Sequence, residues 1–191
     1  MISTRILLDA YRKGYFPMSV AGTIEWYSPE QRGVVPLDEF RIPKRLQRAL
    51  RKGSFETTVN QVFGDVITAC ATRHDPAGNW IDGTILESYV ALHEMGYAHS
   101  IETWHDNKLV GGLYGVSLHG AFFGESMFHT IPDASKVALV ALVTRLRKQN
   151  YRLLDIQWLT PHLAQFGAVE MPRSNYLKSL SDAMTCDCQF L

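Results

Sequence analysis

The sequence predicts an α+β fold in which a mostly helical first half precedes a mixed β-sheet with helices on its faces. Between residues 98 and 128, three strand-like runs are separated only by Asp106-Asn107 and His119-Gly120, and such short connections join antiparallel strands. A helix–strand–helix–strand pattern follows, and a βαβ unit after a meander gives a mixed sheet. We expect a boundary between residues 1–96 and 97–191.

Four helices are predicted in the first half: 3–15, 43–52, one that Asn60 caps and that carries Val62 to Cys70, and about 84–95. Gly14, Gly53 and Gly96 stand at the ends of three of them, where glycine is favoured. Prolines interrupt the segment after the first helix, which we expect to be irregular around Trp26 and Tyr27. A polar loop is expected over 72–82.

The second half is expected to begin with strands over 98–105, 109–117 and 121–128. Asp133 would then cap a long helix, 134–149. A strand over 151–158, a helix from Thr160 or Pro161 to Gly167, and an extended segment from Val169 to Met171 complete a β-β-β-α-β-α-β order.

Composition excludes several classes of protein. The 191 residues are 46% hydrophobic and 20% charged, which is typical of a soluble globular chain, and 19 basic residues balance 19 acidic ones. The longest apolar run, Val137–Val143, is too short to span a membrane, and the first residues do not resemble a signal peptide. Three cysteines do not make a disulfide framework. We expect a cytoplasmic protein with reduced thiols.

Asp155 and Gln157 are the first candidates for chemistry. They lie in the run Leu153–Trp158, and alternate residues of a strand point to the same face. The carboxylate would orient the amide, and the amide oxygen would accept a hydrogen bond from an amine. The alternative is a structural pair that satisfies a loop or a helix end.

Glu125 is the second candidate. It lies among four large apolar side chains, Phe122, Phe123, Met127 and Phe128. Because burying a lone carboxylate is costly, we expect Glu125 to have a partner or to receive an ammonium group. The alternative is a strand-end side chain that reaches solvent past Gly124.

Residues 40–53 form a basic segment without an acidic residue. It holds six of the 19 basic residues: Arg41, Lys44, Arg45, Arg48, Arg51 and Lys52. On a helix most of these charges share one face, while Leu46 and Leu50 occupy the other. This pattern predicts contact with a phosphate backbone, and a solvated helix face is the alternative.

Trp80 follows a polar loop and is a candidate for stacking on a base, whereas Trp26, Tyr27 and Trp104 are expected to fill the core or an interface. The seven histidines show neither a His-Glu-x-x-His nor a His-x-His pattern. No metal site is therefore predicted.

Ten motifs, in order along the chain, resemble the leucyl/phenylalanyl-tRNA–protein transferase family. They are AYRKGYFPM (10–18), WYSPEQRGVVPL (26–37), FRIPKRL (40–46), WI (80–81), LHEMGYAHSIETW (92–104), LVGGLYGV (109–116), GESMF (124–128), ASK-x-AL (134–139), LLDIQ (153–157) and HLAQFGAVEMPR (162–173). Each is weak alone, but ten in the right order are very specific. The resemblance covers about residues 5–180.

The resemblance implies a GNAT-like (acyl-CoA N-acyltransferase-like) C-terminal catalytic domain, residues 97–191, and a smaller N-terminal domain, residues 1–96, that carries the basic helix. Such enzymes move Leu, Phe or Met from the 3′ end of a charged tRNA to the α-amino group of a protein that begins with Arg or Lys. The product is directed to degradation. We therefore expect aminoacyl-tRNA and such proteins as partners, no DNA or membrane, and no cofactor or metal.

The family's functional residues carry over to matching positions of this chain. Its polar catalytic residues match at Asp155, Gln157 and Glu125. Positions that bind the 3′ end of the aminoacyl-tRNA match at Trp80 and Met18. The donor side-chain pocket matches at five apolar residues: Leu113, Phe122, Leu139, Leu142 and Leu154. We expect the basic helix to contact the tRNA backbone near its acceptor end through Lys44, Arg45, Arg48 and Arg51.

The chain departs from the family pattern at a few places. Met18 stands where a Trp often follows Phe-Pro, Tyr27 replaces a second Trp, and Asp133 replaces an Asn. Many relatives also carry an N-terminal extension before the first motif. The extension and Met18 bear on how the 3′-adenosine is held, and none of these departures touches Asp155 or Gln157.

Two other classes of protein remain possible. The first is an acyl-CoA-dependent N-acetyltransferase of the same fold, and the absence of a Gly-rich loop before residue 134 counts against it. The second is a non-catalytic tRNA-binding relative, which would leave the aminoacyl ester intact. The presence of Asp155, Gln157 and Glu125 counts against that class.

Overall fold

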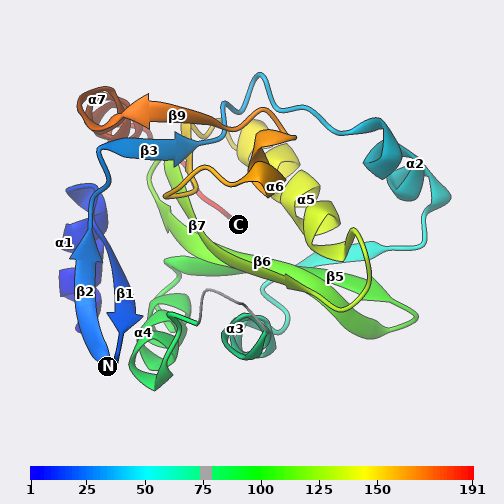
Figure 1. The fold of residues 1–191 in the computed structure, drawn as a ribbon, viewed down its shortest axis with the longest axis horizontal. Coiled ribbons are helices and arrows are strands. Elements are labelled where there is room, and N and C mark those ends of the chain that lie inside the picture. Colours follow the sequence, from blue (N-terminus) through cyan, green and yellow to red (C-terminus); the bar gives the residue numbers. More distant parts are fainter. Residues whose placement is uncertain (74–78) are drawn as a thin grey trace.

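A seven-stranded mixed sheet forms the centre of the molecule in the computed structural model, which describes residues 1–73 and 79–191 (Figure 1). The strand order is β4-β5-β6-β7-β8-β3-β9. Its strands are β3 (Gln31–Val34), β4 (Glu56–Val59), β5 (Ala98–His105), β6 (Lys108–Leu118), β7 (Ala121–His129), β8 (Leu153–Asp155) and β9 (Val169–Pro172). Only β7 and β8 run parallel, and the other neighbours are antiparallel. The predicted α+β class and mixed sheet are confirmed.

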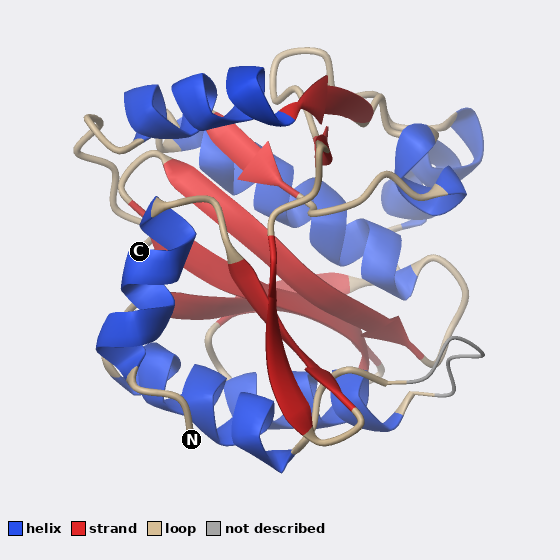
Figure 2. Cartoon of the chain, turned by 60° about the vertical axis from the view of Figure 1, so that its left-hand side comes forward, coloured by secondary structure: helices blue, strands red, loops and turns tan. Residues whose placement is uncertain are grey.

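Helices cover both faces of this sheet (Figure 2). One face packs against α1 (Thr4–Arg12), α3 (Phe63–Thr72), α4 (Gly83–Glu94) and α7 (Arg173–Ala183), and these share a single apolar cluster. The other face packs against α5 (Ala134–Lys148), together with α2 (Lys44–Lys52) and α6 (Pro161–Ala164), around a second cluster. None of the described helices is both long and apolar enough to cross a membrane.

The second half of the chain follows the predicted order. Strands β5, β6 and β7, helix α5, strand β8, helix α6 and strand β9 succeed one another as expected, and α7 follows as an unpredicted helix. The strand predicted over 151–158 is shorter, because the backbone turns after Asp155. Gln157 adopts a left-handed conformation with φ of 58°, which ends the strand.

The sheet crosses the boundary predicted between residues 96 and 97. Strand β3 of the first half lies between β8 and β9, and β4 pairs with β5. The segment predicted to be irregular is a hairpin of β1 (Phe16–Val20) and β2 (Thr23–Tyr27). The described part of the first half therefore holds four strands beside its four helices. The loop predicted over 72–82 includes residues 74–78, which lie outside the described residues.

Of two predicted helix caps, Asn60 is wrong, and Asp133 occupies the expected N-cap position without a side-chain capping hydrogen bond. Asn60 has a φ of 58° and precedes α3 without capping it, since its side chain bonds to the backbone N–H of Ser100 and to His99. Asp133, with a φ of 73°, makes no capping hydrogen bond to α5 and instead accepts one from Lys136 at 2.7 Å. Partners brought by the fold take the Asn60 side chain away from its helix end, whereas Asp133 stands at the N-cap position and its side chain bonds to Lys136 in the same helix.

Gly33 allows β3 to lie against the turn that carries Gln157. Its N–H donates to the Gln157 carbonyl oxygen at 2.9 Å, and its own carbonyl oxygen accepts from the Ile156 N–H at 3.0 Å. A Cβ at this position would stand 2.6 Å from the carbonyl carbon of Trp158, which is closer than atoms tolerate. Glycine is thus required for this approach of two backbones.

Strands β7 and β8 stay together only briefly. Their pairing joins residues 121–123 to 153–155 and then stops. On the other side of β7, the register with β6 shifts between Tyr114 and Gly115, so that Glu125 is the extra residue of a β-bulge. The sheet therefore opens beside a bulge that directs Glu125. Two of the candidate residues, Glu125 and Asp155, lie at this opening.

Candidate active site

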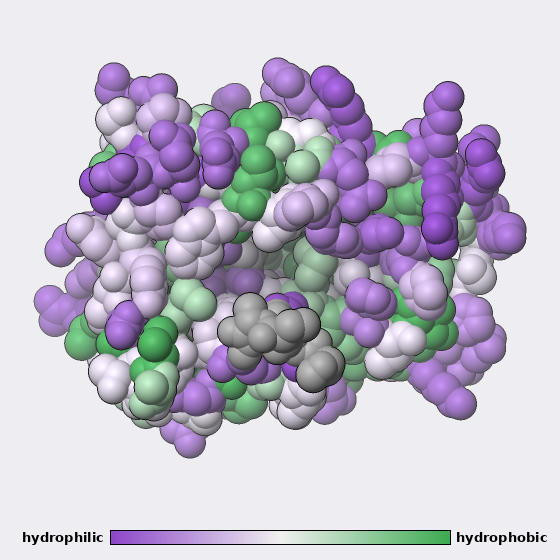
Figure 3. Space-filling model, in the orientation of Figure 1, coloured by the Kyte–Doolittle hydropathy of each residue, from purple (hydrophilic) through white to green (hydrophobic). Residues whose placement is uncertain are grey.

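A pocket of about 580 Å³ opens where β7 and β8 separate. It brings together most of the predicted residues: the apolar Leu113, Leu139, Leu142 and Leu154, the polar Glu125 and Gln157, and the rim residues Trp80 and Met18. The surface is hollowed near the centre of the face drawn in Figure 3. This volume suits a small-molecule group rather than a flat protein contact.

Phe122 and Asp155, two of the predicted residues, do not line this pocket. Phe122 is fully buried behind it and stacks on Phe190, with ring centroids 5.2 Å apart. Asp155 is also fully buried, beneath the turn that carries Gln157. Both therefore support the walls of the pocket from behind.

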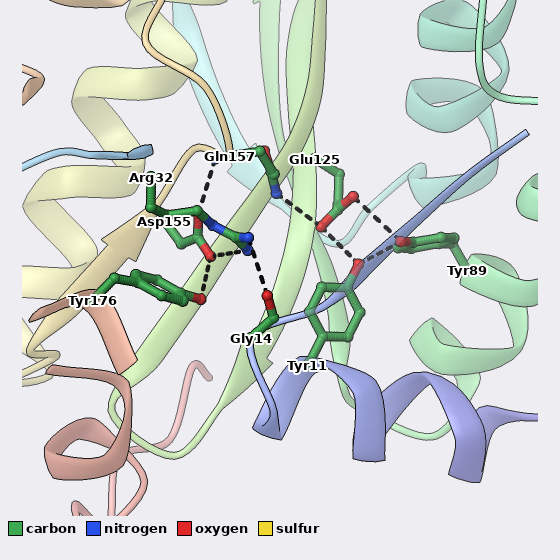
Figure 4. Close-up of polar contacts among 8 residues, drawn as sticks. All are labelled: Tyr11, Gly14, Arg32, Tyr89, Glu125, Asp155, Gln157 and Tyr176. Carbon is green, nitrogen blue, oxygen red and sulfur yellow. Dashed lines mark hydrogen bonds and ion pairs between the residues drawn. The ribbon is translucent and has the colours of Figure 1, made fainter. Parts of the chain in front are cut away.

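A buried ion pair fixes Asp155. Arg32 on β3 donates from Nε to one carboxylate oxygen at 2.9 Å and from Nη2 to the other at 2.7 Å (Figure 4). Tyr176 on α7 donates a further hydrogen bond at 2.7 Å, and the Gln157 backbone N–H donates one at 2.9 Å. Both members of the ion pair are at most 1% exposed. Four hydrogen bonds from three residues thus fix the carboxylate.

Arg32 is held equally firmly. Its third nitrogen donates to the carbonyl oxygen of Gly14 at 3.1 Å, and its guanidinium lies 4.6 Å from the ring centroids of Phe16 and Tyr176. Burial opposes its charge, but the neighbouring Asp155 outweighs that effect, so the pKa of Arg32 lies above its ordinary value. Burial and Asp155 also raise the pKa of Tyr176, which therefore remains a donor.

These contacts correct the predicted relation between Asp155 and Gln157. The carboxylate does not orient the amide of Gln157 from the same face of a strand. It holds the backbone N–H of Gln157 instead, because the strand ends at Asp155 and Arg32 occupies the carboxylate. The Gln157 amide group points to Glu125, with its Nε2 3.3 Å from Oε1.

Glu125 accepts hydrogen bonds from two tyrosines of the N-terminal half. Tyr11 on α1 donates to Oε1 at 2.7 Å, and Tyr89 on α4 donates to Oε2 at 3.3 Å (Figure 4). The two hydroxyls also contact each other. Burial raises the pKa of both tyrosines well above the ordinary value, so both remain protonated donors.

The surroundings of Glu125 favour its neutral form. Burial raises its pKa from 4.5 to about 8, the hydrogen bond from Tyr11 opposes this, and the charge of Asp155 adds to it. At neutral pH the carboxyl group of the free protein is therefore mostly protonated. A cation that entered the pocket would stabilise the carboxylate form.

An aromatic rim borders the pocket. The Phe16 and Trp158 rings meet edge to face at 5.0 Å, and both line the opening. Met18 and Trp80 line it too, and they are neighbours because the Ser19 N–H donates to the Trp80 carbonyl oxygen at 3.1 Å. The aromatic members of this rim, Phe16, Trp80 and Trp158, offer flat surfaces on which a nucleobase can stack.

The basic helix α2 lies apart from the pocket, at the right-hand end of Figure 1. Lys44, Arg45, Arg48 and Arg51 are all exposed, while Leu46 is buried. Hydrophilic side chains project over this end of the molecule in Figure 3. Arg45 lies 3.8 Å from Asp133 near the start of α5, which connects the basic surface to that helix.

Four residues of the polar network were not among the predicted site residues: Tyr11, Arg32, Tyr89 and Tyr176. Tyr11 and Arg32 stand inside two of the motifs that carry the family resemblance. Their roles depend on contacts across 114 and 123 positions of the chain, respectively. No local pattern in the sequence indicates such pairings.

Comparison with known proteins identifies relatives over the whole chain. Residues 34–181 match the family model "Leucyl/phenylalanyl-tRNA protein transferase", and residues 1–30 match the model of that family's N-terminal domain. The chain is 50% identical over 186 residues to the leucyl/phenylalanyl-tRNA–protein transferase of Akkermansia muciniphila, with 96% of each chain covered. It is 47% identical over 190 residues to that of Herpetosiphon aurantiacus, with 99% of this chain and 98% of the relative covered.

Two solved structures share the fold at low identity. The C-terminal domain of a putative lysylphosphatidylglycerol synthetase from Agrobacterium fabrum aligns with a TM-score of 0.51 and 15% identity, over 95% of this chain and 70% of that one. A functionally unknown conserved protein from Staphylococcus epidermidis aligns with a TM-score of 0.50 and 10% identity, over 90% and 65% of the two chains. This likeness concerns the fold alone.

Removing the charge of Arg32 should destabilise the protein strongly. Arg32→Met keeps most of the side-chain volume but leaves Asp155 buried without its cation, so we expect the free energy of unfolding to fall by about 3–5 kcal/mol. Urea unfolding measures it. Arg12→Met removes the exposed pair with Asp9 and should cost less than about 1 kcal/mol. A loss as small in Arg32→Met as in Arg12→Met would contradict the central role of this pair.

The raised pKa of Glu125 should make stability depend on pH. The proton on Glu125 stabilises the folded state fully below about pH 4.5, and this stabilisation is lost as pH rises through about 8. Glu125→Gln should therefore gain about 3–5 kcal/mol relative to the unsubstituted protein between pH 5 and pH 9. Urea unfolding at both pH values tests this, with the exposed Glu170→Gln as control. Parallel pH profiles for all three proteins would show that Glu125 titrates normally.

Proposed function

The chain belongs to the leucyl/phenylalanyl-tRNA–protein transferase family, and from this membership we propose that it transfers an aminoacyl group from charged tRNA to the α-amino group of a protein. We further propose Leu, Phe and Met as the donor residues and Arg or Lys as the first residue of the acceptor. The product would be directed to degradation. Its place of action would be the cytoplasm, where charged tRNA is found.

The observation that carries this proposal is an apolar chamber that opens directly beside a carboxamide and a carboxylate. Leu113, Leu139, Leu142 and Leu154 line one part of the pocket, and Gln157 and Glu125 line the adjoining part. An aminoacyl side chain in the apolar part would leave its ester next to Gln157. An amine that enters from the polar part would then meet the ester carbon, which is the positioning that aminolysis requires.

In the proposed reaction the acceptor amine attacks the ester carbonyl carbon. A C–N bond forms, the bond to the tRNA 3′-oxygen breaks, and the proton of the amine ends on that leaving oxygen. The Gln157 Nε2 group points to Glu125, which leaves the amide oxygen free to accept a hydrogen bond from the amine. An α-amino group has a pKa of roughly 8, so a fair fraction is neutral at physiological pH.

Asp155 acts in this scheme as a positioning residue. It accepts a hydrogen bond from the Gln157 backbone N–H and is itself fixed by Arg32 and Tyr176. The turn that carries Gln157 is therefore held in one position. Glu125 would bind the positive charge of the acceptor's first side chain. Its raised pKa supports this, because burial penalises the carboxylate and a bound cation would offset that penalty.

The donor pocket would select aminoacyl groups whose side chains do not branch at Cβ. Its apolar leucines cannot reward a hydroxyl or a charge, and fit in such a pocket is worth about 1–3 kcal/mol per methylene. Leu, Phe and Met should enter, whereas Val and Ile carry an extra group at Cβ. Phe122 is buried behind these leucines and does not line the pocket, but by supporting them it would limit how deep the pocket is.

We propose that Trp80 and Met18 hold the 3′-adenosine at the rim, and that Lys44, Arg45, Arg48 and Arg51 contact phosphates near the acceptor end. Exposed cations on one helix, together with flat side chains at the pocket, are the features that bind a single-stranded 3′ end. In this arrangement residues 97–191 form a GNAT-like catalytic part, and residues 1–96 supply the tRNA contacts.

An acyl-CoA donor fits the site less well. The carboxylate of Asp133 stands directly before α5 and bonds to Lys136, so a pyrophosphate at this helix end would meet a negative charge. The geometry therefore favours the tRNA ester over a CoA thioester. It does not favour a binding-only role, because Gln157 and Glu125 both face the pocket.

A transfer assay tests the function directly. The protein is incubated with a mixed pool of charged tRNAs and a peptide that begins with Arg, and mass spectrometry measures the products. We expect the peptide to gain the mass of Leu, Phe or Met, with little Val or Ile. Gln157→Ala should lower the single-turnover rate at least about tenfold, while Gln165→Ala, at an exposed position directly after α6, should not. Acylation from acyl-CoA, or binding of charged tRNA without transfer, would overturn the proposal.

The role of α2 in tRNA binding can be tested through its salt dependence. Arg48→Ala with Arg51→Ala should raise the KM for charged tRNA and reduce the slope of log affinity against log salt, by roughly 0.7–0.9 for each phosphate that is no longer neutralised. Transfer from a short aminoacyl-adenosine should stay nearly unchanged, because this donor has no acceptor stem. Arg5→Ala with Lys178→Ala removes two exposed charges on α1 and α7 and serves as control. Equal reductions in activity on both donors would show that α2 acts otherwise.

A further inference from the structure

Two buried side-chain polar atoms in the described part of the chain lack a hydrogen-bond partner: the hydroxyl of Tyr114 and Nε2 of His162. Both residues line the pocket. Buried polar atoms in folded proteins are nearly always paired, because an unpaired one has lost its water without compensation. That both exceptions border one cavity indicates groups that a bound substrate satisfies.

The ring of Tyr114 is fixed in place. The side chain is 0% exposed and meets the rings of Tyr89 and Phe63 edge to face, at 5.6 and 5.8 Å between centroids. It therefore cannot turn outward to find water. Burial also raises the pKa of Tyr114 well above its ordinary value, so the oxygen remains a neutral hydroxyl that can accept as well as donate.

Tyr114 stands at the bulge that directs Glu125. On the antiparallel pair of β6 and β7 it lies directly opposite Ser126, so the two side chains share a face, and Glu125 is the adjoining extra residue. Arg73 is the cation of the same pocket wall, and its Nη1 bonds to Ser126 and to the Met127 carbonyl oxygen. The charged groups that line the pocket near Tyr114 are therefore Glu125 and Arg73.

Glu125 alone cannot satisfy a bound cation. Its carboxylate already accepts from Tyr11, Tyr89 and Gln157, which uses three of about four acceptor positions. A guanidinium brings five N–H groups and an ammonium three, and each N–H that is buried needs an acceptor. The unpartnered oxygen of Tyr114 is the neighbouring acceptor on this face.

We propose that Tyr114 determines specificity for the acceptor: its hydroxyl oxygen accepts a hydrogen bond from the cationic side chain of the acceptor's first residue, beside Glu125. This inference rests on the proposed function, since it assigns a further part of the same site. It divides the polar part of the pocket into a charge, supplied by Glu125, and a neutral acceptor, supplied by Tyr114.

Tyr114→Phe tests the proposal, because it removes one oxygen and keeps the ring. At saturating charged tRNA, the KM for a peptide that begins with Arg should rise about tenfold or more, the usual effect of losing a hydrogen bond to a charged group. The kcat and the KM for charged tRNA should stay within about twofold. The Tm should be unchanged or higher, because the hydroxyl that is removed had no partner.

Tyr151→Phe is the matched control. Its hydroxyl bonds to Ser117 at 2.6 Å and lies outside the pocket, so this variant should have a lower Tm and unchanged kinetic constants. Three results would overturn the proposal: an unchanged acceptor KM in Tyr114→Phe, an effect on the tRNA KM or kcat alone, or a fall in Tm like that of Tyr151→Phe. Transfer by the unsubstituted protein in the same assay distinguishes failure of the role of Tyr114 from failure of the proposed function. If it transfers and Tyr114→Phe matches it, only the role of Tyr114 fails, whereas absence of transfer removes the proposed function as well.

Discussion

The buried pair of Arg32 and Asp155 is the interaction on which the site depends. It joins β3 to β8, and its outer contacts reach Tyr176 on α7 and the carbonyl oxygen of Gly14 after α1. Removing two charges from water is costly, and here two parallel hydrogen bonds, a tyrosine hydroxyl and two aromatic faces compensate. Because the carboxylate also holds the Gln157 N–H, the same pair that joins distant segments sets the position of the turn that carries Gln157.

The pocket follows from the way the sheet opens. Strands β7 and β8 pair over three residues and then separate, and the bulge in β7 turns Glu125 to the same face as Tyr114. Around the pocket, the α5 side supplies leucines with Ile156 and Met127, whereas the opposite side supplies the polar groups of Tyr114, Arg73 and Glu125. A molecule bound in this opening would therefore contact apolar side chains on one side and polar side chains on the other, with Gln157 between them.

Local patterns in the sequence predict the parts that local physics determines. The strands over 98–128 and the helix over 43–52 follow from the residue pattern. The four pocket leucines come from the family resemblance instead, and the structure brings them together. Strand β3 is not predicted, because its four residues pair with segments near the far end of the chain. The turn at Gln157 is not predicted either, because its cause, the approach of Gly33, lies 124 positions away in sequence and leaves no local signal. A partner contributed by the fold likewise displaces Asn60 from its expected cap, whereas Asp133 keeps the N-cap position and bonds to Lys136 in the same helix.

The position of β3 between β8 and β9 has a consequence for the order in which the molecule is made. Strand β3 leaves the ribosome well before its two neighbours and can pair with them only after residues 153–172 have been synthesised, and Tyr176 comes later still. Until then Arg32 has no carboxylate to bind and stays in water. Pairings of this sequence separation form slowly, since a long loop must close first. Helix α7 thus completes a centre to which Arg32 was committed much earlier, and a chain that stopped before α7 would contain the leucines of the pocket without the Tyr176 contact to Asp155.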